Sequence, residues 1–230
     1  MSQEIITLPS KSRFGSVNCY LIKADAAYFL VDTGWSSQRA ALEKELENSG
    51  CQPGNLNLIL VTHGDFDHTG NCAYLRERYR TKIAMHRGDS VLVEQGDMFI
   101  NRKINPLMRG IIKIGASLFG LSKFDRFKAD IFIEDGQDLA EYGLDAKVLL
   151  VPGHSKGSIA ILTPSSDPAS GSWQALFCGD LLVNSSQPAK NSLVDDAAAL
   201  DASVERVKQL KPVTVYPGHG KPFPVELLPL

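Results

Sequence analysis

The chain has 230 residues, a formal net charge of −2 and 43% hydrophobic residues, which suits one α/β domain and excludes a disordered chain. The near-neutral charge argues against nucleic-acid binding, which usually requires a basic face. No apolar run reaches the roughly 18 residues of a membrane-spanning helix, and Glu4 stands where a signal peptide would carry lysine or arginine, so we expect a cytoplasmic protein.

Short apolar runs separated by polar residues predict alternating strands and helices along the chain. The expected strands are 17–22 and 28–31 (a hairpin), 56–62, 82–85, 147–151, 158–163, 175–178 and 213–216. The expected helices are 36–48, 73–80 and 197–210. Because strands and helices are interleaved in both halves and no linker divides them, we predict one layered α/β domain over residues 1–230.

Residues 101–128 differ from the rest, with seven lysines or arginines and one acidic residue. Apolar residues at steps of three and four predict a basic amphipathic helical insertion; they are Ile104, Leu107, Ile111, Ile114, Leu118 and Leu121. Such a helix is an ordinary surface helix, a lid beside the active site, or a contact with a partner or an anionic membrane surface.

Histidines and aspartates follow several of the expected strands at glycine-containing turns. His63, Asp65, Asp67 and His68 lie after the strand 56–62, and His154, Asp180 and His219 each follow a later strand. Taken singly, each of these residues is read more simply as part of a turn. Together they place nitrogen and oxygen ligands at one edge of the sheets, which predicts a bound metal such as zinc, iron or manganese.

The order of these residues resembles the metallo-β-lactamase superfamily, whose pattern is His-x-His-x-Asp-His, then a histidine, a bridging aspartate and a last histidine. Residues 18–22 and 30–34 are similar to the family's opening hairpin, so the resemblance spans nearly the whole chain. It implies a four-layer αβ/βα sandwich that holds two metals in a cleft between the edges of its sheets.

The resemblance also implies the ligand sets. The first metal would take His63, Asp65 and His154, the second would take Asp67, His68 and His219, and Asp180 would bridge them. Asp65 departs from the pattern, because the family usually has histidine there. An ionised Asp65 makes the site one charge unit less positive and suits harder ions, which weakens the assignment of zinc to both positions. In the alternative, Asp65 points away and the first site is weak or empty.

Four other residues receive roles near this site. We expect Asp32 to brace the metal loop through hydrogen bonds, and His86 to be a hydrogen-bonded residue of the rim. Lys156 and Asn184 are candidates for contact with the substrate. The four cysteines are scattered without a CxxC pair and are read as small buried hydrophobic residues.

The function that the resemblance implies is metal-assisted hydrolysis of an ester, thioester or lactone of a small acyl compound. Two divalent ions, zinc or else iron or manganese, would make a bridging hydroxide, and Asp67 would hold it and accept its proton. The alternatives are a mononuclear iron oxygenase acting on a thiol or persulfide, lactam hydrolysis at the same site, and a binding protein without catalysis.

Overall fold

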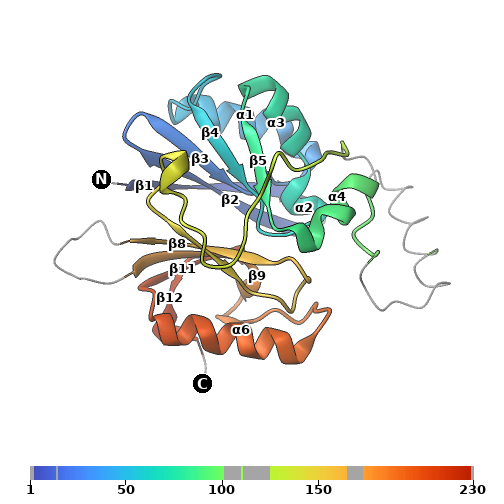
Figure 1. Ribbon diagram of the computed structural model, residues 1–230, viewed down its shortest axis with the longest axis vertical. Coiled ribbons are helices and arrows are strands. Elements are labelled where there is room, and N and C mark those ends of the chain that lie inside the picture. Colours follow the sequence, from blue (N-terminus) through green and yellow to red (C-terminus); the bar gives the residue numbers. More distant parts are fainter. Residues whose placement is uncertain (1–2, 14, 101–109, 111–124, 165–172, 229–230) are drawn as a thin grey trace.

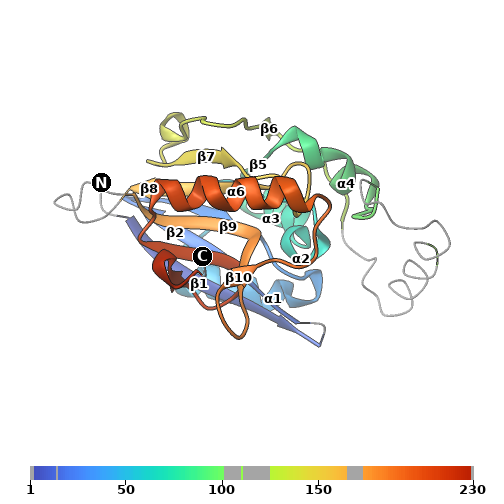
Figure 2. The ribbon, with the colours of Figure 1, turned by 90° about the horizontal axis from the view of Figure 1, so that it is seen from below.

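Two β-sheets face each other, and helices cover their outer sides (Figures 1 and 2). The computed structural model describes residues 3–13, 15–100, 110, 125–164 and 173–228. Within these residues the layers run helix, sheet, sheet, helix, which is the four-layer αβ/βα sandwich expected from the sequence. None of the described helices is long and apolar enough to span a membrane.

The first sheet has the strands in chain order. They are β1 (Gln3–Ser12), β2 (Gly15–Ala24), β3 (Ala27–Val31), β4 (Leu56–Leu60), β5 (Lys82–Met85) and β6 (Ile131–Phe132). The first three strands pair antiparallel, whereas β3 to β6 run parallel. Because β3, β4 and β5 run parallel, their carboxyl ends lie at one edge of this sheet.

The second sheet has the order β12-β11-β9-β8-β7, with β10 paired to β9. Its strands are β7 (Lys147–Leu150), β8 (Ile159–Pro164), β9 (Trp173–Asn184), β10 (Ala189–Lys190), β11 (Thr214–Gly220) and β12 (Phe223–Pro224). Only β9 and β11 are parallel neighbours. These two strands carry Asp180 and His219.

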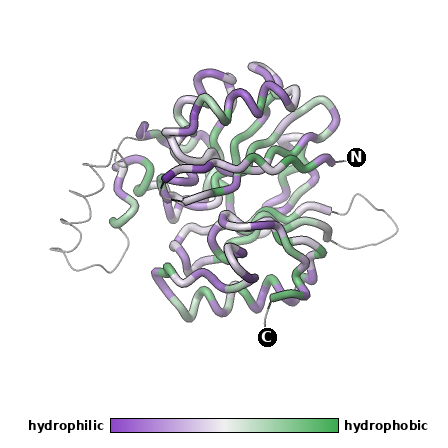
Figure 3. The backbone as a smooth tube through the Cα atoms, turned by 180° about the vertical axis from the view of Figure 1, so that it is seen from behind, coloured by the Kyte–Doolittle hydropathy of each residue, from purple (hydrophilic) through white to green (hydrophobic). Residues whose placement is uncertain are grey.

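Helices lie outside both sheets and in the connections. They are the α-helices α1 (Arg39–Asn48), α2 (Phe66–Thr69), α3 (Cys72–Tyr79), α4 (Ser90–Gln95) and α6 (Ala197–Leu210), and the 3-10 helices η1 (Ser36–Gln38), η2 (Arg87–Asp89), η3 (Ala140–Tyr142) and η5 (Val225–Leu227). Asp196 begins α6 by accepting a hydrogen bond from the Ala199 amide. Hydrophobic and hydrophilic residues alternate along α6, as its burial on one side requires (Figure 3).

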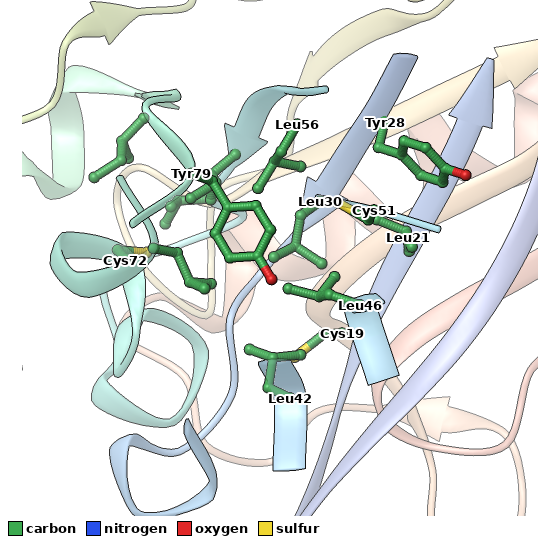
Figure 4. Close-up of a cluster of buried hydrophobic side chains, with 14 of the residues drawn as sticks. Cys19, Leu21, Tyr28, Leu30, Leu42, Leu46, Cys51, Leu56, Cys72 and Tyr79 are labelled. Carbon is green, nitrogen blue, oxygen red and sulfur yellow. The ribbon is translucent and has the colours of Figure 1, made fainter. Parts of the chain in front are cut away.

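Three buried hydrophobic clusters fill the spaces between the four layers. The cluster between the first sheet and its helices includes Leu30, Leu46 and Tyr79, and it also holds Cys19, Cys51 and Cys72 (Figure 4). The other two lie between the sheets and between the second sheet and α6. All four cysteines are buried and free, as the sequence indicated.

Several elements differ from the sequence-based expectations or lie outside the described residues. Strands β1, β6, β10 and β12 and helices α2 and α4 were not predicted. Strands β9 and β11 do not stop before Gly179 and Pro217; they continue through these residues with shifts in register, so Asp180 and His219 lie within strands and not in the turns expected after them. The helix predicted over 101–128 lies almost entirely outside the described residues.

Candidate metal centre

The loop after β4 carries four of the predicted ligands. Helix α2 begins directly after Asp65, whose backbone oxygen accepts hydrogen bonds from the amides of His68 and Thr69. The Asp65 side chain does not cap this helix. Instead, Asp65 Oδ2 lies 3.3 Å from His154 Nε2 and 3.8 Å from His63 Nε2. The loop therefore directs this carboxylate toward the histidines and not away from them.

Six of the seven predicted ligands converge as two neighbouring clusters, and the seventh, Asp65, lies beside the first of them. The first cluster is His63, His154 and Asp180, and the second cluster is Asp67, His68 and His219. Within each cluster, one ligand atom per residue lies within 4.8 Å of the others. Asp180 approaches both: its Oδ1 is 3.3 Å from His68 Nε2 and its Oδ2 is 3.9 Å from His154 Nε2. The geometry gives two candidate metal sites with one shared carboxylate.

All four histidines use Nδ1 for a hydrogen bond directed away from the clusters. The Nδ1 contacts are His63 to Thr62 Oγ1 at 3.0 Å, His68 to Asp32 Oδ2 at 2.8 Å, His154 to the Leu193 carbonyl at 2.6 Å and His219 to the Ser16 carbonyl at 2.8 Å. Oxygen acceptors at these positions favour the tautomer with the proton on Nδ1. The lone pair of each Nε2 then faces the clusters, as a metal ligand requires.

Several atoms at the centre are buried without a hydrogen-bond partner among the described residues. They are His63 Nε2, His68 Nε2 and Asp180 Oδ1. Leaving buried polar atoms unsatisfied costs about 1–3 kcal/mol each, and a native protein rarely gathers three at one point. Divalent cations would satisfy all three, so the residues present fit a metal centre.

Burial and mutual charge shift the titration of these groups. Burial, together with the neighbouring His68 and His154, lowers the pKa of His63 well below its usual value. Burial also raises the pKa of Asp67. Burial acts to lower the pKa of His68, but the carboxylates of Asp180, Asp32 and Asp67 together outweigh it and raise that pKa well above normal. A bound cation would replace this proton as the partner of the carboxylates.

Asp32 braces the metal loop, as expected. Its Oδ1 accepts from the Thr62 amide at 2.8 Å and its Oδ2 accepts from the Thr62 hydroxyl at 2.7 Å. The same Oδ2 holds the ring of His68. One buried carboxylate thus fixes the end of β4 and one ligand of the second cluster.

Two side chains of β2 hold the strand that carries His219. Asn18 Nδ2 donates to the carbonyls of Pro217 and Gly220 at 3.1 and 2.6 Å. The hydroxyl of Tyr20 donates to the Pro217 carbonyl at 2.6 Å. These bonds join the two sheets beside the second cluster.

Asp89 was not predicted from the sequence as part of the site. It is fully buried and accepts hydrogen bonds from the Gly64 amide at 2.9 Å, the Gly157 amide at 2.7 Å and the Ser155 hydroxyl at 2.6 Å. Asp89 therefore ties the loop of His63 to the loop of His154. The available signal was its position, since Gly88-Asp89 follows the expected strand 82–85 as Gly179-Asp180 follows the expected strand 175–178.

The remaining predicted residues lie outside the two clusters. Lys156 is exposed on the loop after His154, and the Asn184 amide donates to the Lys221 carbonyl at 2.9 Å. Their contact with substrate stays a prediction. His86 Nδ1 accepts from the Gly88 amide, which agrees with a hydrogen-bonded role at the rim.

Gly218 is expected to be essential because the centre leaves no room for a Cβ atom there. A Cβ would lie 2.4 Å from Asp180 Oδ1 and 2.7 Å from His68 Cε1. The Gly218 φ angle is not positive, so alanine is tolerated by the backbone. We expect Gly218→Ala to weaken metal binding about tenfold or more with little change in the stability of the metal-free protein. Chelator competition measures the first and urea unfolding the second; unchanged metal affinity would contradict this geometry.

Comparison with models of known protein families identifies the family of this chain. The family model described as metallo-beta-lactamase superfamily matches residues 12–219. The chain belongs to the metallo-β-lactamase superfamily. The family and the fold expected from the sequence are thereby confirmed.

Individual members of the superfamily are distant from the chain in sequence. "Probable metallo-hydrolase YqjP" of Bacillus subtilis is 24% identical, with 95% of this chain and 71% of that protein aligned. "Hydroxyacylglutathione hydrolase GloC" of Haemophilus influenzae is 27% identical over 72% of this chain and 66% of its own length. With several such relatives the chain spans less than two thirds of the relative's length.

Solved structures of the superfamily share the fold. The structure titled "TTHA1623 in a di-iron-bound form" has a TM-score of 0.68 at 27% identity and covers 95% of each chain. The BLEG-1 B3 metallo-β-lactamase has a TM-score of 0.73 at 21% identity, covering 97% of this chain and 95% of its own. One of these two structural neighbours is thus a protein described in a form with two bound irons.

Proposed function

We propose that this protein is a metallo-hydrolase that binds two divalent ions and cleaves an ester, thioester or lactone of a small acyl compound. The observation that carries the proposal is the common orientation of four imidazoles, each with Nδ1 bonded outward and Nε2 facing a carboxylate-rich centre.

The proposed ligand sets follow the two clusters, with Asp65 added to the first because its carboxylate lies 3.3 Å from His154 Nε2. His63, His154 and Asp65 would hold the first ion, and Asp67, His68 and His219 the second; Asp180 would contact both. We propose zinc for these positions. Iron is a specific competitor, because a structural neighbour at 27% identity holds two irons and Asp65 adds a hard oxygen donor to the first site.

Two bound divalent ions would lower the pKa of a shared water toward about 7, making hydroxide available near neutral pH. Asp67 would orient that water and accept its proton, because it is the ligand carboxylate whose side chain is most open to solvent, at 16%.

Two observations support a thioester or lactone as the bond that is cleaved. The relatives include a hydroxyacylglutathione hydrolase, whose name specifies a thioester, and Asp65 leaves the centre less positive than an all-histidine site. A less positive centre stabilises anionic intermediates less, which favours activated acyl bonds such as thioesters and lactones over amides. A hydroxyacylglutathione thioester is therefore the first substrate to try.

The experiment is metal analysis followed by a substrate screen. Protein purified without added metal is expected to hold close to two zinc ions per chain and to lose turnover of a thioester or lactone after chelation. Turnover should return when zinc is added back. Full turnover after exhaustive chelation would refute the proposal. One iron per chain with oxygen consumption would instead favour the oxygenase that acts on a thiol or persulfide.

A further inference from the structure

The segment that runs from β10 to the start of α6 contacts ligands of both candidate sites. We call this segment, residues 189–196, the strap. Asn191 Nδ2 donates to Asp180 Oδ2 at 3.1 Å, and the Leu193 carbonyl accepts from His154 Nδ1 at 2.6 Å. Within three residues, the strap thus holds the shared carboxylate and one imidazole. Neither residue was predicted from the sequence.

The orientation of the Asn191 amide is set by its other hydrogen bond. Asn191 Oδ1 accepts from the backbone amide of Leu193 at 3.0 Å. A backbone N–H can only donate, so the oxygen of the Asn191 amide must face it. The NH₂ group consequently faces Asp180, where it meets an acceptor, and the opposite amide orientation would leave both contacts repulsive.

The strap is anchored to the same elements that carry the two ligands. Strand β10 pairs with β9, and the Asn191 backbone amide donates to the Leu181 carbonyl, next to Asp180. At the other end, the amides of Asp195 and Asp196 both donate to the carbonyl of Gly153, next to His154. The Asn191 side chain is therefore presented to Asp180 by a backbone that is fixed at both ends.

The hydrogen bond to Asn191 distinguishes the two oxygens of Asp180. Oδ2 accepts from Asn191 and also lies 3.4 Å from His219 Nε2. Oδ1 has no hydrogen-bond partner among the described residues and points toward His68. Without the amide, the carboxylate could rotate about its last side-chain bond and lose this arrangement.

We infer that Asn191 is a positioning residue for the metal centre: it fixes the rotation of the Asp180 carboxylate so that its oxygens face both clusters at once. The inference rests on the proposed function insofar as the clusters bind metal. Asn191 would thus orient Asp180 by a hydrogen bond, as Asp32 orients the ring of His68. Second-layer partners of this kind typically change metal affinity by about 10–100-fold.

The test compares Asn191→Ala with Asn57→Ala in the 230-residue protein. Asn191→Ala removes the donor to Asp180. Asn57→Ala makes the same chemical change at an exposed position of β4 that contacts neither cluster, so it is the matched control. Zinc affinity is measured by chelator competition, and the ligand field by the absorption spectrum of the cobalt-loaded protein. Urea unfolding of the metal-free forms reports any loss of stability.

We expect Asn191→Ala to bind zinc at least about tenfold more weakly than the wild type and to alter the cobalt spectrum. Asn57→Ala should match the wild type in both. Equal zinc affinity and equal spectra for Asn191→Ala would overturn the inference while leaving the proposed function intact, as would a loss of stability without a change in affinity. If the wild type itself binds no metal, both fail.

Discussion

Replacing Asp180 with asparagine should remove metal from both clusters and reduce turnover by roughly a thousandfold. The amide keeps the size of the side chain but lacks the charge and one of the two oxygens that face the rings of His68 and His219. Loss of a single electrostatic contributor to a transition state commonly costs a factor of about 100 to 1,000, and here a shared ligand is lost as well. Metal content per chain and turnover of the substrate found in the screen measure the two effects.

His219→Ala separates the shared ligand from an unshared one. His219 belongs to the second cluster only and is partly exposed, so its loss should lower occupancy of one site and leave close to one metal per chain. Asp25→Asn is the matched control for Asp180→Asn, because Asp25 is exposed in the turn between β2 and β3. Its φ of 53° suits asparagine as well as aspartate. If Asp180→Asn retained two metals, the shared role would be refuted.

The parts of the fold that the sequence predicted well are those with a clear apolar period. Residues 197–210 form α6 with the predicted bounds, because Leu200, Val204 and Val207 pack on the second sheet from one face of the helix. Strand β1 has no such signal. It is an edge strand with polar and charged residues among a few apolar ones, and its pairing with β2 along ten positions supplies the order that its composition lacks.

Glycine and proline explain the errors at β9 and β11. Both residues usually interrupt strands, so the predicted strands stopped before Gly179 and Pro217. In the structure Gly179 adopts a φ of 49° and β11 shifts its register at Pro217, which lets both strands continue. The irregular backbone lies beside the two ligands, as bulges near active sites often do.

In the candidate site, too, some features could be predicted from the sequence and others could not. The ligand types and their order were readable from the sequence, because the motif of residues 63–68 is local and the other ligands follow strands. The partners that orient them were not. Asn191 meets Asp180, the Ser16 carbonyl meets His219 and Asp89 meets Gly157 only in the folded chain, at sequence separations of 11, 203 and 68 residues. Two of these contacts use backbone atoms, which leave no mark on residue identity.

Asp89→Ala should be the most destabilising single substitution outside the hydrophobic core that the site region offers. The buried carboxylate satisfies the amides of Gly64 and Gly157 and the hydroxyl of Ser155. Each buried donor left without an acceptor costs about 1–3 kcal/mol. Part of this is recovered, because burial raises the pKa of Asp89 and the charged group is itself costly to bury. We expect the free energy of unfolding of the metal-free protein to fall by about 3 kcal/mol.

Urea unfolding at pH 7 measures this loss, and two further variants test its cause. Ser155→Ala removes one donor and leaves the carboxylate bonded to both amides, so it should cost only about 1 kcal/mol. Asp89→Asn keeps the shape but turns an NH₂ group toward one of the donors, and its cost should lie between the other two. Because Asp89 joins the loops of His63 and His154, zinc affinity at the first cluster should fall in the same order as stability. A loss below about 1 kcal/mol for Asp89→Ala would mean that the two loops are held together by other contacts, and that the first cluster does not depend on this carboxylate.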